Sequence, residues 1–126
     1  MYFRKKNMQS FIKSFFYALN GLCYSWSMGR NFRIQIVLGV VAFSLCFAFR
    51  VERWEWIVVS ILTGGVLALE TLNSAVETLC NHITLEQDPS IKKIKDLSAG
   101  AVLIFSFFAL VIGCLIFIPR IISIFS

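Results

Sequence analysis

Residues 56–81, with the sequence WIVVSILTGGVLALETLNSAVETLCN, decide the fold of this chain. The first half of the stretch is a nearly continuous apolar run, and the second half places Glu70 and Glu77 in the same run. A charged residue at the centre of a membrane helix costs at least about 2.5 kcal/mol on insertion scales, so an acid there marks a candidate functional site. The stretch therefore predicts a membrane helix that carries a polar site.

The composition of the whole chain fits an integral membrane protein. Of its 126 residues, 58% are hydrophobic, and the mean hydropathy of +0.78 is far above the usual range of soluble proteins. A bilayer crossing needs about 20 mostly apolar residues. We predict an all-α integral membrane protein with transmembrane helices over residues 32–49, 57–79 and 97–118, in a single domain that covers residues 1–126.

Residues 1–30 have a different pattern. Their apolar side chains recur at the i, i+3, i+4, i+7 spacing of one helix face, whereas Lys13, Ser14 and Asn20 occupy other faces. The pattern predicts an amphipathic helix that lies in the membrane interface, and the basic residues near its start favour this position. A helix packed against the bundle is the alternative.

The distribution of lysine and arginine predicts the orientation in the membrane. Up to the start of the first span all charged residues are basic, and the loop after the second span contains three lysines, whereas the connection RVERWEW (residues 50–56) has two charges of each sign. By the positive-inside rule the N-terminus and the loop after the second span are cytoplasmic. The basic residues on this side are Arg4, Lys5, Lys6, Lys13, Arg30, Arg33, Lys92, Lys93 and Lys95.

Four polar residues of the second span share one helix face because of their spacing: Glu70, Asn73, Glu77 and Asn81. Magnesium binds hard oxygen ligands, usually one or two carboxylates together with phosphate oxygens, and lysines neutralise phosphates. The face and the nearby KKIKD segment are therefore typical of a site for a divalent cation and a polyphosphate. The sequence contains no GxxxxGK[ST] phosphate loop, so a nucleotide site here belongs to another architecture.

Two other interpretations of this face stay open. Glu70 and Glu77 could form ion pairs with Lys95 or Arg33 that only hold the bundle together. The two glutamates could also line a proton or ion pathway, which predicts cation flux without ATP. A pathway gives no reason for the Lys-Asp pair before the third span.

The segments ALETLNSAVETLCN (residues 68–81) and PSIKKIKDLSAGAVL (residues 89–103) closely resemble the prokaryotic diacylglycerol kinase family, which includes the undecaprenol kinases. The resemblance extends over nearly the whole chain. It implies a small homotrimeric enzyme of the bacterial inner (cytoplasmic) membrane that transfers the γ-phosphoryl group of ATP to a lipid hydroxyl, with Mg²⁺. The acceptor would be diacylglycerol or undecaprenol, and no nucleic acid is expected as a partner.

The resemblance also implies roles for individual residues. Glu70 would be the catalytic base that accepts the proton of the lipid hydroxyl. Glu77 would bind the metal, and Asn73, Glu77, Lys95 and Asp96 would bind the nucleotide. Lys95 would offset charge on the transferring phosphoryl group.

Three positions depart from the family pattern. Gly29 stands where the family usually has a metal-binding glutamate, Asn81 where it has an aspartate, and Asp88 where it has a histidine before the proline. Two negative charges are thereby lost, unless Asp88 compensates, and Gly29 is expected either to weaken metal binding or to permit a sharp turn. The alternative function is a catalytically weakened homologue that acts as a lipid-binding or structural membrane protein.

Overall fold

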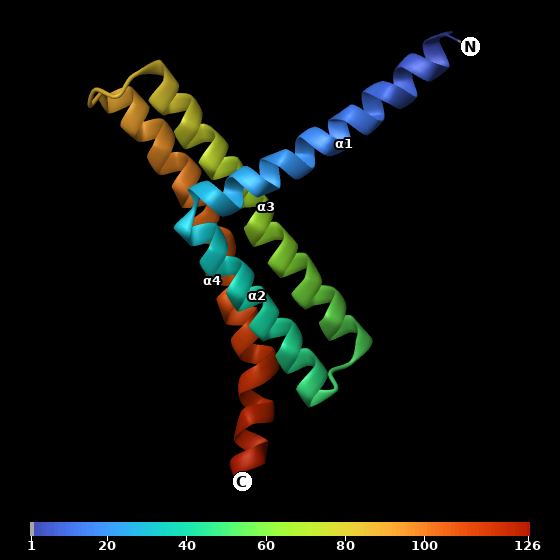
Figure 1. Ribbon diagram of the computed structural model, residues 1–126. Coiled ribbons are helices and arrows are strands. Elements are labelled where there is room, and N and C mark those ends of the chain that lie inside the picture. Colours follow the sequence, from blue (N-terminus) through green and yellow to red (C-terminus); the bar gives the residue numbers. More distant parts are fainter. Residues whose placement is uncertain (1) are drawn as a thin grey trace.

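The computed structural model describes residues 2–126, with side chains described from residue 7 onward. In this range the chain forms four helices and no strand: α1 (Tyr2–Met28), α2 (Arg30–Phe49), α3 (Arg53–Ile83) and α4 (Pro89–Phe125) (Figure 1). The all-α prediction is confirmed. The side chains of Arg4, Lys5 and Lys6, which favour a surface position for the first helix, lie outside the described part.

Three helices are long and apolar enough to cross a membrane, as predicted: α2, α3 and α4. The helices α3 and α4 have 31 and 37 residues. At 1.5 Å per residue they are about 46 and 55 Å long, whereas the hydrocarbon core of a bilayer is about 30 Å thick. Both helices therefore extend beyond the apolar stretches from which the spans were predicted.

Local hydrogen bonds set the starts of the two long helices. α3 begins with a capping box, in which the Glu55 carboxylate accepts a hydrogen bond of 3.2 Å from the backbone amide of Glu52. α4 begins after Asp88, whose Oδ1 accepts from the backbone amide of Ser90 at 2.8 Å. Pro89 fits the first helical position because its missing amide hydrogen would have no partner there.

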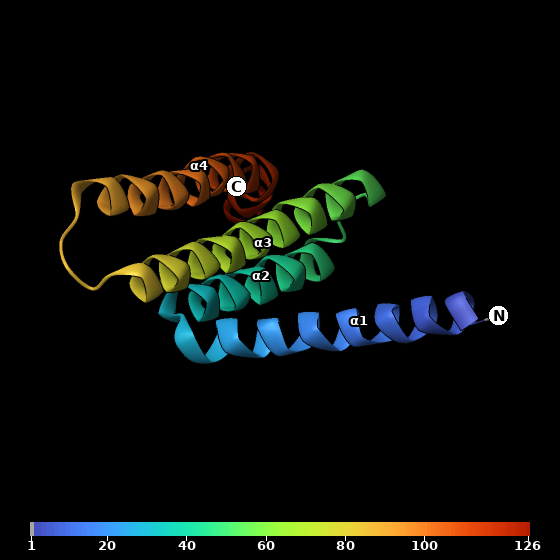
Figure 2. The ribbon, with the colours of Figure 1, turned by 90° about the horizontal axis from the view of Figure 1, so that it is seen from above.

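The helix α3 is the centre of the bundle. It packs against α2 on one side and against α4 on another, while α2 and α4 contact each other much less (Figure 2). The helix α1 crosses the bundle near its own C-terminal end, and its N-terminal part points away from the other helices (Figure 1). Most large apolar side chains of α1 are exposed in this single chain, and its position in the membrane interface stays a prediction.

The buried apolar core lies where α2 ends and α3 begins, which we call the α2–α3 end; the opposite end is the α3–α4 end. Cys46, Val59 and Phe117 are among the core residues. Next to them, Arg120 donates two hydrogen bonds of 2.6 Å to the carboxylate of Glu55, whose side chain is 3% exposed. The pair fixes the end of α4 to the start of α3.

Candidate active site

The predicted polar residues of α3 lie on one face, from a buried carboxylate to an exposed one. Glu70 and Asn73 are 5% and 7% exposed, and Glu77 and Asn81 are exposed. We call these four residues the polar face. It is shielded at its Glu70 end and open at its Asn81 end, so it reaches from the interior of the bundle to its surface at the α3–α4 end.

The amide of Asn73 contacts the exposed carboxylate of the polar face. Its Nδ2 donates a hydrogen bond of 3.4 Å to Oε1 of Glu77, while its Oδ1 is buried and has no hydrogen-bond partner among the described residues. A buried acceptor without a partner costs about 1–3 kcal/mol. The unpaired Oδ1 beside the Glu77 carboxylate therefore marks a place where a cation or a hydrogen-bond donor of a ligand would be stabilised.

The C-terminal part of α1 contacts α3 next to Glu70. Ser25 is 4% exposed, and its hydroxyl donates to Oγ1 of Thr71 at 3.4 Å. Thr71 in turn donates to the backbone carbonyl of Leu67 at 2.9 Å. These hydrogen bonds join α1 to α3 at the residue that follows Glu70, so α1 helps to close the buried end of the polar face.

The two glutamates of the polar face do not serve as ion-pair partners in the bundle. Neither Glu70 nor Glu77 forms an ion pair with a side chain of residues 7–126. Arg33 instead donates to the backbone carbonyls of Trp26 at 2.7 Å and Ser27 at 3.1 Å, near the end of α1. The interpretation that Arg33 or Lys95 neutralises these carboxylates to hold the bundle together is therefore wrong for this chain.

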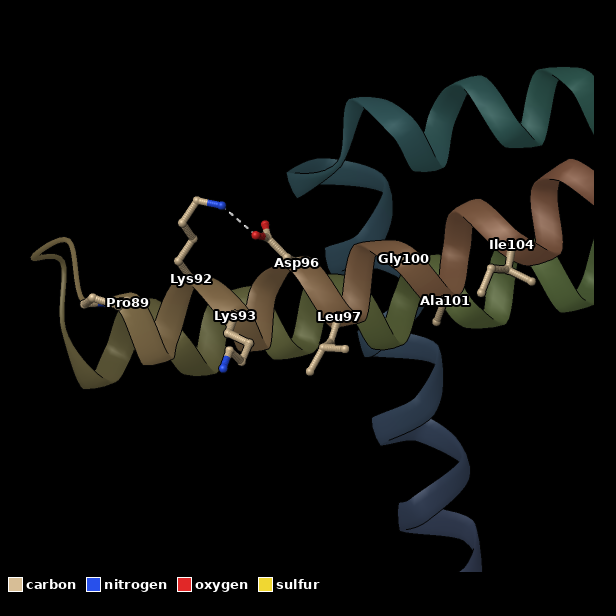
Figure 3. Close-up of a pocket in the computed structure, with 8 residues that line it drawn as sticks. All are labelled: Pro89, Lys92, Lys93, Asp96, Leu97, Gly100, Ala101 and Ile104. Atoms are coloured by element: carbon tan, nitrogen blue, oxygen red, sulfur yellow. Dashed lines mark hydrogen bonds and ion pairs between the residues drawn. The ribbon is translucent and has the colours of Figure 1, made fainter.

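Lys95 and Asp96 have different partners although they are adjacent in sequence. Lys95 Nζ donates to Oδ1 of Asn81 on the polar face at 2.7 Å. Asp96 Oδ2 instead forms an ion pair of 2.6 Å with Lys92 Nζ (Figure 3). Because α4 already begins at Pro89, both residues lie in its second turn rather than at its start.

Asp96 lines a pocket on one face of α4, and none of the residues that line it belongs to the polar face (Figure 3). The pocket has a volume of about 640 Å³. The structure thus brings Lys95 to Asn81, at the exposed end of the polar face. It places Asp96 on another side of α4. The lining residues are Pro89, Lys92, Lys93, Asp96, Leu97, Gly100, Ala101 and Ile104.

Gly29 does not provide a turn that only glycine can make. It precedes α2 with φ −113° and ψ 111°, an extended conformation open to any residue. A Cβ atom at this position would lie 3.1 Å from the carbonyl oxygen of Ser25 and 3.4 Å from Cβ of Phe32. A larger residue therefore needs only a small shift of its neighbours, and the expectation of a turn that requires glycine is wrong.

The oxygen atoms of the polar face are of the kind that binds a magnesium ion together with a polyphosphate. No group of three or more His, Cys, Asp or Glu residues that could hold a metal occurs in the described part of the chain, and Asp88 caps α4. Magnesium, however, usually takes only one or two protein carboxylates and completes its shell with water and phosphate oxygens. Glu77 would supply a carboxylate ligand of this kind, and Oδ1 of Asn73 would supply a neutral oxygen.

Sequence reasoning missed two contacts at this site. It placed Asn81 on the polar face but did not predict the hydrogen bond from Lys95 to Asn81. The proximity of the first turns of the following helix could have suggested this hydrogen bond. It gave no role to Ser25 or Thr71, and no pattern in the sequence distinguishes them from other hydroxyl residues in the same helices.

The fold and the site together define a class: a small all-helical membrane protein that carries a buried and an exposed carboxylate on one face of a spanning helix. Comparison with known sequences identifies the family within this class. The sequence model of the prokaryotic diacylglycerol kinases matches residues 16–117. The chain belongs to the prokaryotic diacylglycerol kinase family, and it is a lipid kinase.

Three relatives are similar over most of this chain. The undecaprenol kinase of Bacillus subtilis is 33% identical over 116 residues, which cover 92% of this chain and 94% of the relative. A diacylglycerol kinase of Synechocystis is 32% identical over 111 residues, or 87% of this chain and 63% of the relative. A diacylglycerol kinase of Pseudomonas aeruginosa is 31% identical over 85 residues, or 68% and 69%. These relatives do not favour the alternative of a catalytically weakened homologue that acts as a lipid-binding or structural membrane protein.

Proposed function

We propose that this chain transfers the γ-phosphoryl group of ATP to the hydroxyl of a membrane lipid, at the cytoplasmic face of a bacterial inner membrane. The observation that carries the proposal is the polar face, which combines the buried carboxylate of Glu70 with the exposed carboxylate of Glu77. A lipid hydroxyl approaches from the membrane and a nucleotide from water. The polar face offers one carboxylate to each.

Glu70 is the catalytic base in this proposal. Its carboxylate accepts the proton of the lipid hydroxyl while the hydroxyl oxygen forms a bond to the γ-phosphorus and the bond from that phosphorus to the bridging oxygen of ADP breaks. The products are a lipid phosphate and ADP. Burial beside α1 keeps water, a competing acceptor, away from this carboxylate.

Glu77 and Asn73 would hold the magnesium ion that accompanies the nucleotide. When bound, magnesium neutralises charge on the phosphates during phosphoryl transfer. The carboxylate of Glu77 supplies the protein charge, and the unpaired Oδ1 of Asn73 supplies a neutral oxygen. The remaining ligands are water and phosphate oxygens.

Lys95 and Asp96 bind the nucleotide. The ammonium group of Lys95 contacts Asn81. Asn81 lies 11 residues after Glu70, which is about 16 Å along the axis of α3. We therefore assign Lys95 to the phosphates nearer the nucleoside rather than to the transferring phosphoryl group. Asp96 contributes after release from its exposed ion pair with Lys92, which is weak because both side chains are in solvent.

Undecaprenol is the proposed acceptor. Nearly the whole length of the undecaprenol kinase of Bacillus subtilis aligns with this chain. A mostly apolar groove of about 580 Å³ between α2, α3 and α4 has room for a hydrocarbon chain, and Asn31 and Gln35 line it at the end of α2 nearest the polar face. The part of the prenyl chain next to the hydroxyl would lie in this groove, with the hydroxyl directed to Glu70.

Two further parts of the proposal concern the assembly. We propose that α1 is an amphipathic helix in the membrane interface, because its large apolar side chains are exposed in the single chain. We also propose a homotrimer. Glu77 is exposed in the single chain, and a neighbouring copy would cover the part of this side chain that does not face the nucleotide and water.

The acceptor is tested with purified protein in mixed micelles that contain undecaprenol or diacylglycerol, Mg²⁺ and ATP labelled at the γ-phosphate. We expect labelled lipid with undecaprenol and at least tenfold less with diacylglycerol. The reverse preference would contradict the assignment of undecaprenol while supporting the kinase activity. Absence of labelled lipid with both acceptors would contradict the proposed function.

A further inference from the structure

Gly113 of α4 has neither of the reasons that usually place a glycine inside a helix. Its φ is not positive, and a Cβ atom at this position would meet no neighbouring side chain or helix of the described chain within 4 Å. Glycine weakens a helix interior relative to alanine. At Gly39, by contrast, a Cβ atom would lie 2.8 Å from Cγ2 of Thr63, so glycine there permits close packing. The open space beside Gly113 needs another explanation.

This open space belongs to the apolar groove between α2, α3 and α4. The residues of α4 that line the groove recur at the spacing of one helix face, from Ser106 through Ala109 and Gly113 to Phe117. Gly113 lies seven residues after Ser106, which is about 10 Å along the axis of α4. Gly64 also has open space around it, but it does not line the groove.

The groove is polar at one end and apolar along the rest of α2. Asn31 and Gln35 line the end at the start of α2, and Oε1 of Gln35 is buried without a hydrogen-bond partner in the described part of the chain. The lining residues of α2 between positions 38 and 45 are all apolar. Near Gly113, Phe117 lines the groove and belongs to the buried core, which closes the far end. A molecule with one polar end and one long apolar chain matches this distribution.

We propose that Gly113 is a specificity-determining residue, which leaves the far part of the groove open to the chain of a long polyprenol. The inference rests on the proposed function, since it assumes that the acceptor lies in this groove. With the hydroxyl at the polar face, the first isoprene units lie between α2 and α4, and the following units pass Gly113. A large side chain at position 113 would take the space of these following units and leave the space of the first units free.

A helix of a second copy of this chain is the competing occupant of the groove. Ala109 and Gly113 have the spacing of small residues at which two membrane helices approach each other closely. Such a helix would have to place a polar side chain beside Gln35. A prenol brings its hydroxyl toward this end by its own structure, so the observed distribution favours the lipid.

The test compares wild type, Gly113→Phe and Leu103→Phe as full-length protein in mixed micelles, with undecaprenol or a prenol of two isoprene units as acceptor. We expect Gly113→Phe to lower kcat/KM for undecaprenol at least about tenfold, because the ring removes space in which the chain is buried. The value for the short prenol is expected to stay within about twofold. Leu103 is 70% exposed on α4 and does not line the groove, so Leu103→Phe is expected to leave both values within about twofold.

Three outcomes would overturn the inference. An equal fall for both acceptors in Gly113→Phe would mean that the ring disturbs the protein as a whole. An unchanged kcat/KM for undecaprenol would mean that the chain does not pass position 113. A change in the native mass of Gly113→Phe relative to wild type and Leu103→Phe would assign the groove to a second copy.

Photolabelling without ATP decides the inference even if wild type phosphorylates no lipid, or only one of the two acceptors. The probe is a prenol of four isoprene units that carries a diazirine on the last unit. We expect it to label wild type on α4 between Ala109 and Phe117, with displacement by excess undecaprenol, and to label Gly113→Phe at least about fivefold less. Equal labelling of Gly113→Phe, or no labelling of this part of α4 in wild type, would contradict the inference.

Discussion

At the scale of single residues, the proposed role of Glu77 as a metal ligand can be tested by one substitution. Its carboxylate is exposed, and among the described residues it accepts a single long hydrogen bond, from Asn73, so it is available to a cation. Glu77→Gln keeps the shape of the side chain and removes the charge that a divalent cation requires. We expect kcat/KM to fall at least about 100-fold, measured by transfer of labelled phosphate to lipid.

The control for this substitution is Glu86→Gln, which removes an exposed carboxylate from the α3–α4 loop. Glu86→Gln is expected to retain wild-type activity, and both variants are expected to elute from a sizing column as the parent does. Normal turnover by Glu77→Gln would show that this residue is not the metal ligand.

Gly29 offers the opposite kind of change, the gain of a carboxylate. Its extended backbone accepts a glutamate, and the nearest neighbours need to move by only a few tenths of an ångström. We expect Gly29→Glu to lower the magnesium concentration for half-maximal activity by about three- to tenfold, because affinity for hard cations rises with ligand charge. The measurement is a magnesium titration of both proteins, with Gly29→Gln as the uncharged control.

An unchanged titration in a well-folded Gly29→Glu protein would mean that the metal is not held within reach of position 29. An equal shift in Gly29→Gln would assign the effect to the backbone or to size rather than to charge.

The polar face itself could be predicted at this scale, because a spacing of three, four and four residues fixes a common side of a helix. The partners of its residues could not. Whether Lys95 meets Glu77 or Asn81 depends on the rotation of α4 about its axis and on the length of the loop. The capping role of Asp88 likewise follows from where α4 begins, which the apolar pattern placed later in the chain.

At the scale of helices, the existence and order of the spans followed from hydropathy, but their ends did not. Hydropathy detects the part of a helix that faces lipid. Beyond that part, the helix continues as far as backbone hydrogen bonds and caps permit. Asp88 caps the start of α4, and the Glu52–Glu55 capping box caps the start of α3. The ion pair of Glu55 and Arg120 was also beyond prediction, since it joins residues 65 positions apart.

The packing of α3 against α4 depends on Gly65. A Cβ atom at this position would overlap the ring of Phe105, whereas one at Gly64 would meet nothing within 4 Å. We expect Gly65→Ala to destabilise the protein by about 1–3 kcal/mol through overpacking. Gly64→Ala is expected to be neutral or to stabilise by up to about 1 kcal/mol, because alanine favours helices.

Thermal unfolding in detergent, followed by circular dichroism, checks both variants. Equal melting temperatures for Gly65→Ala and Gly64→Ala would contradict the close contact between α3 and Phe105.

At the scale of the whole molecule, the single chain already buries Glu70 to 5% exposure. The single chain therefore buries Glu70 and leaves Glu77 exposed. A trimer remains our prediction, because exposed Glu77 and the small residues Gly100 and Ala101 on the outer face of α4 suit close approach of another helix.

Native mass measurement in mild detergent is expected to give three times the chain mass of 14.3 kDa. Replacing Ala101 with Trp is expected to shift the distribution toward monomer if α4 forms the contact. A monomer alone, under conditions in which the wild-type protein is active, would contradict the predicted trimer.

The central claim is that the polar face of α3 transfers the γ-phosphoryl group of ATP to a lipid hydroxyl, with Glu70 as the base. The most direct measurement is a single-turnover assay with γ-labelled ATP, undecaprenol and excess enzyme, comparing wild type with Glu70→Gln. We predict that wild type forms labelled lipid phosphate, and that Glu70→Gln forms it at least about 100-fold more slowly while binding Mg-ATP with nearly unchanged affinity. No labelled lipid from wild type, or a wild-type rate from Glu70→Gln, would contradict the claim.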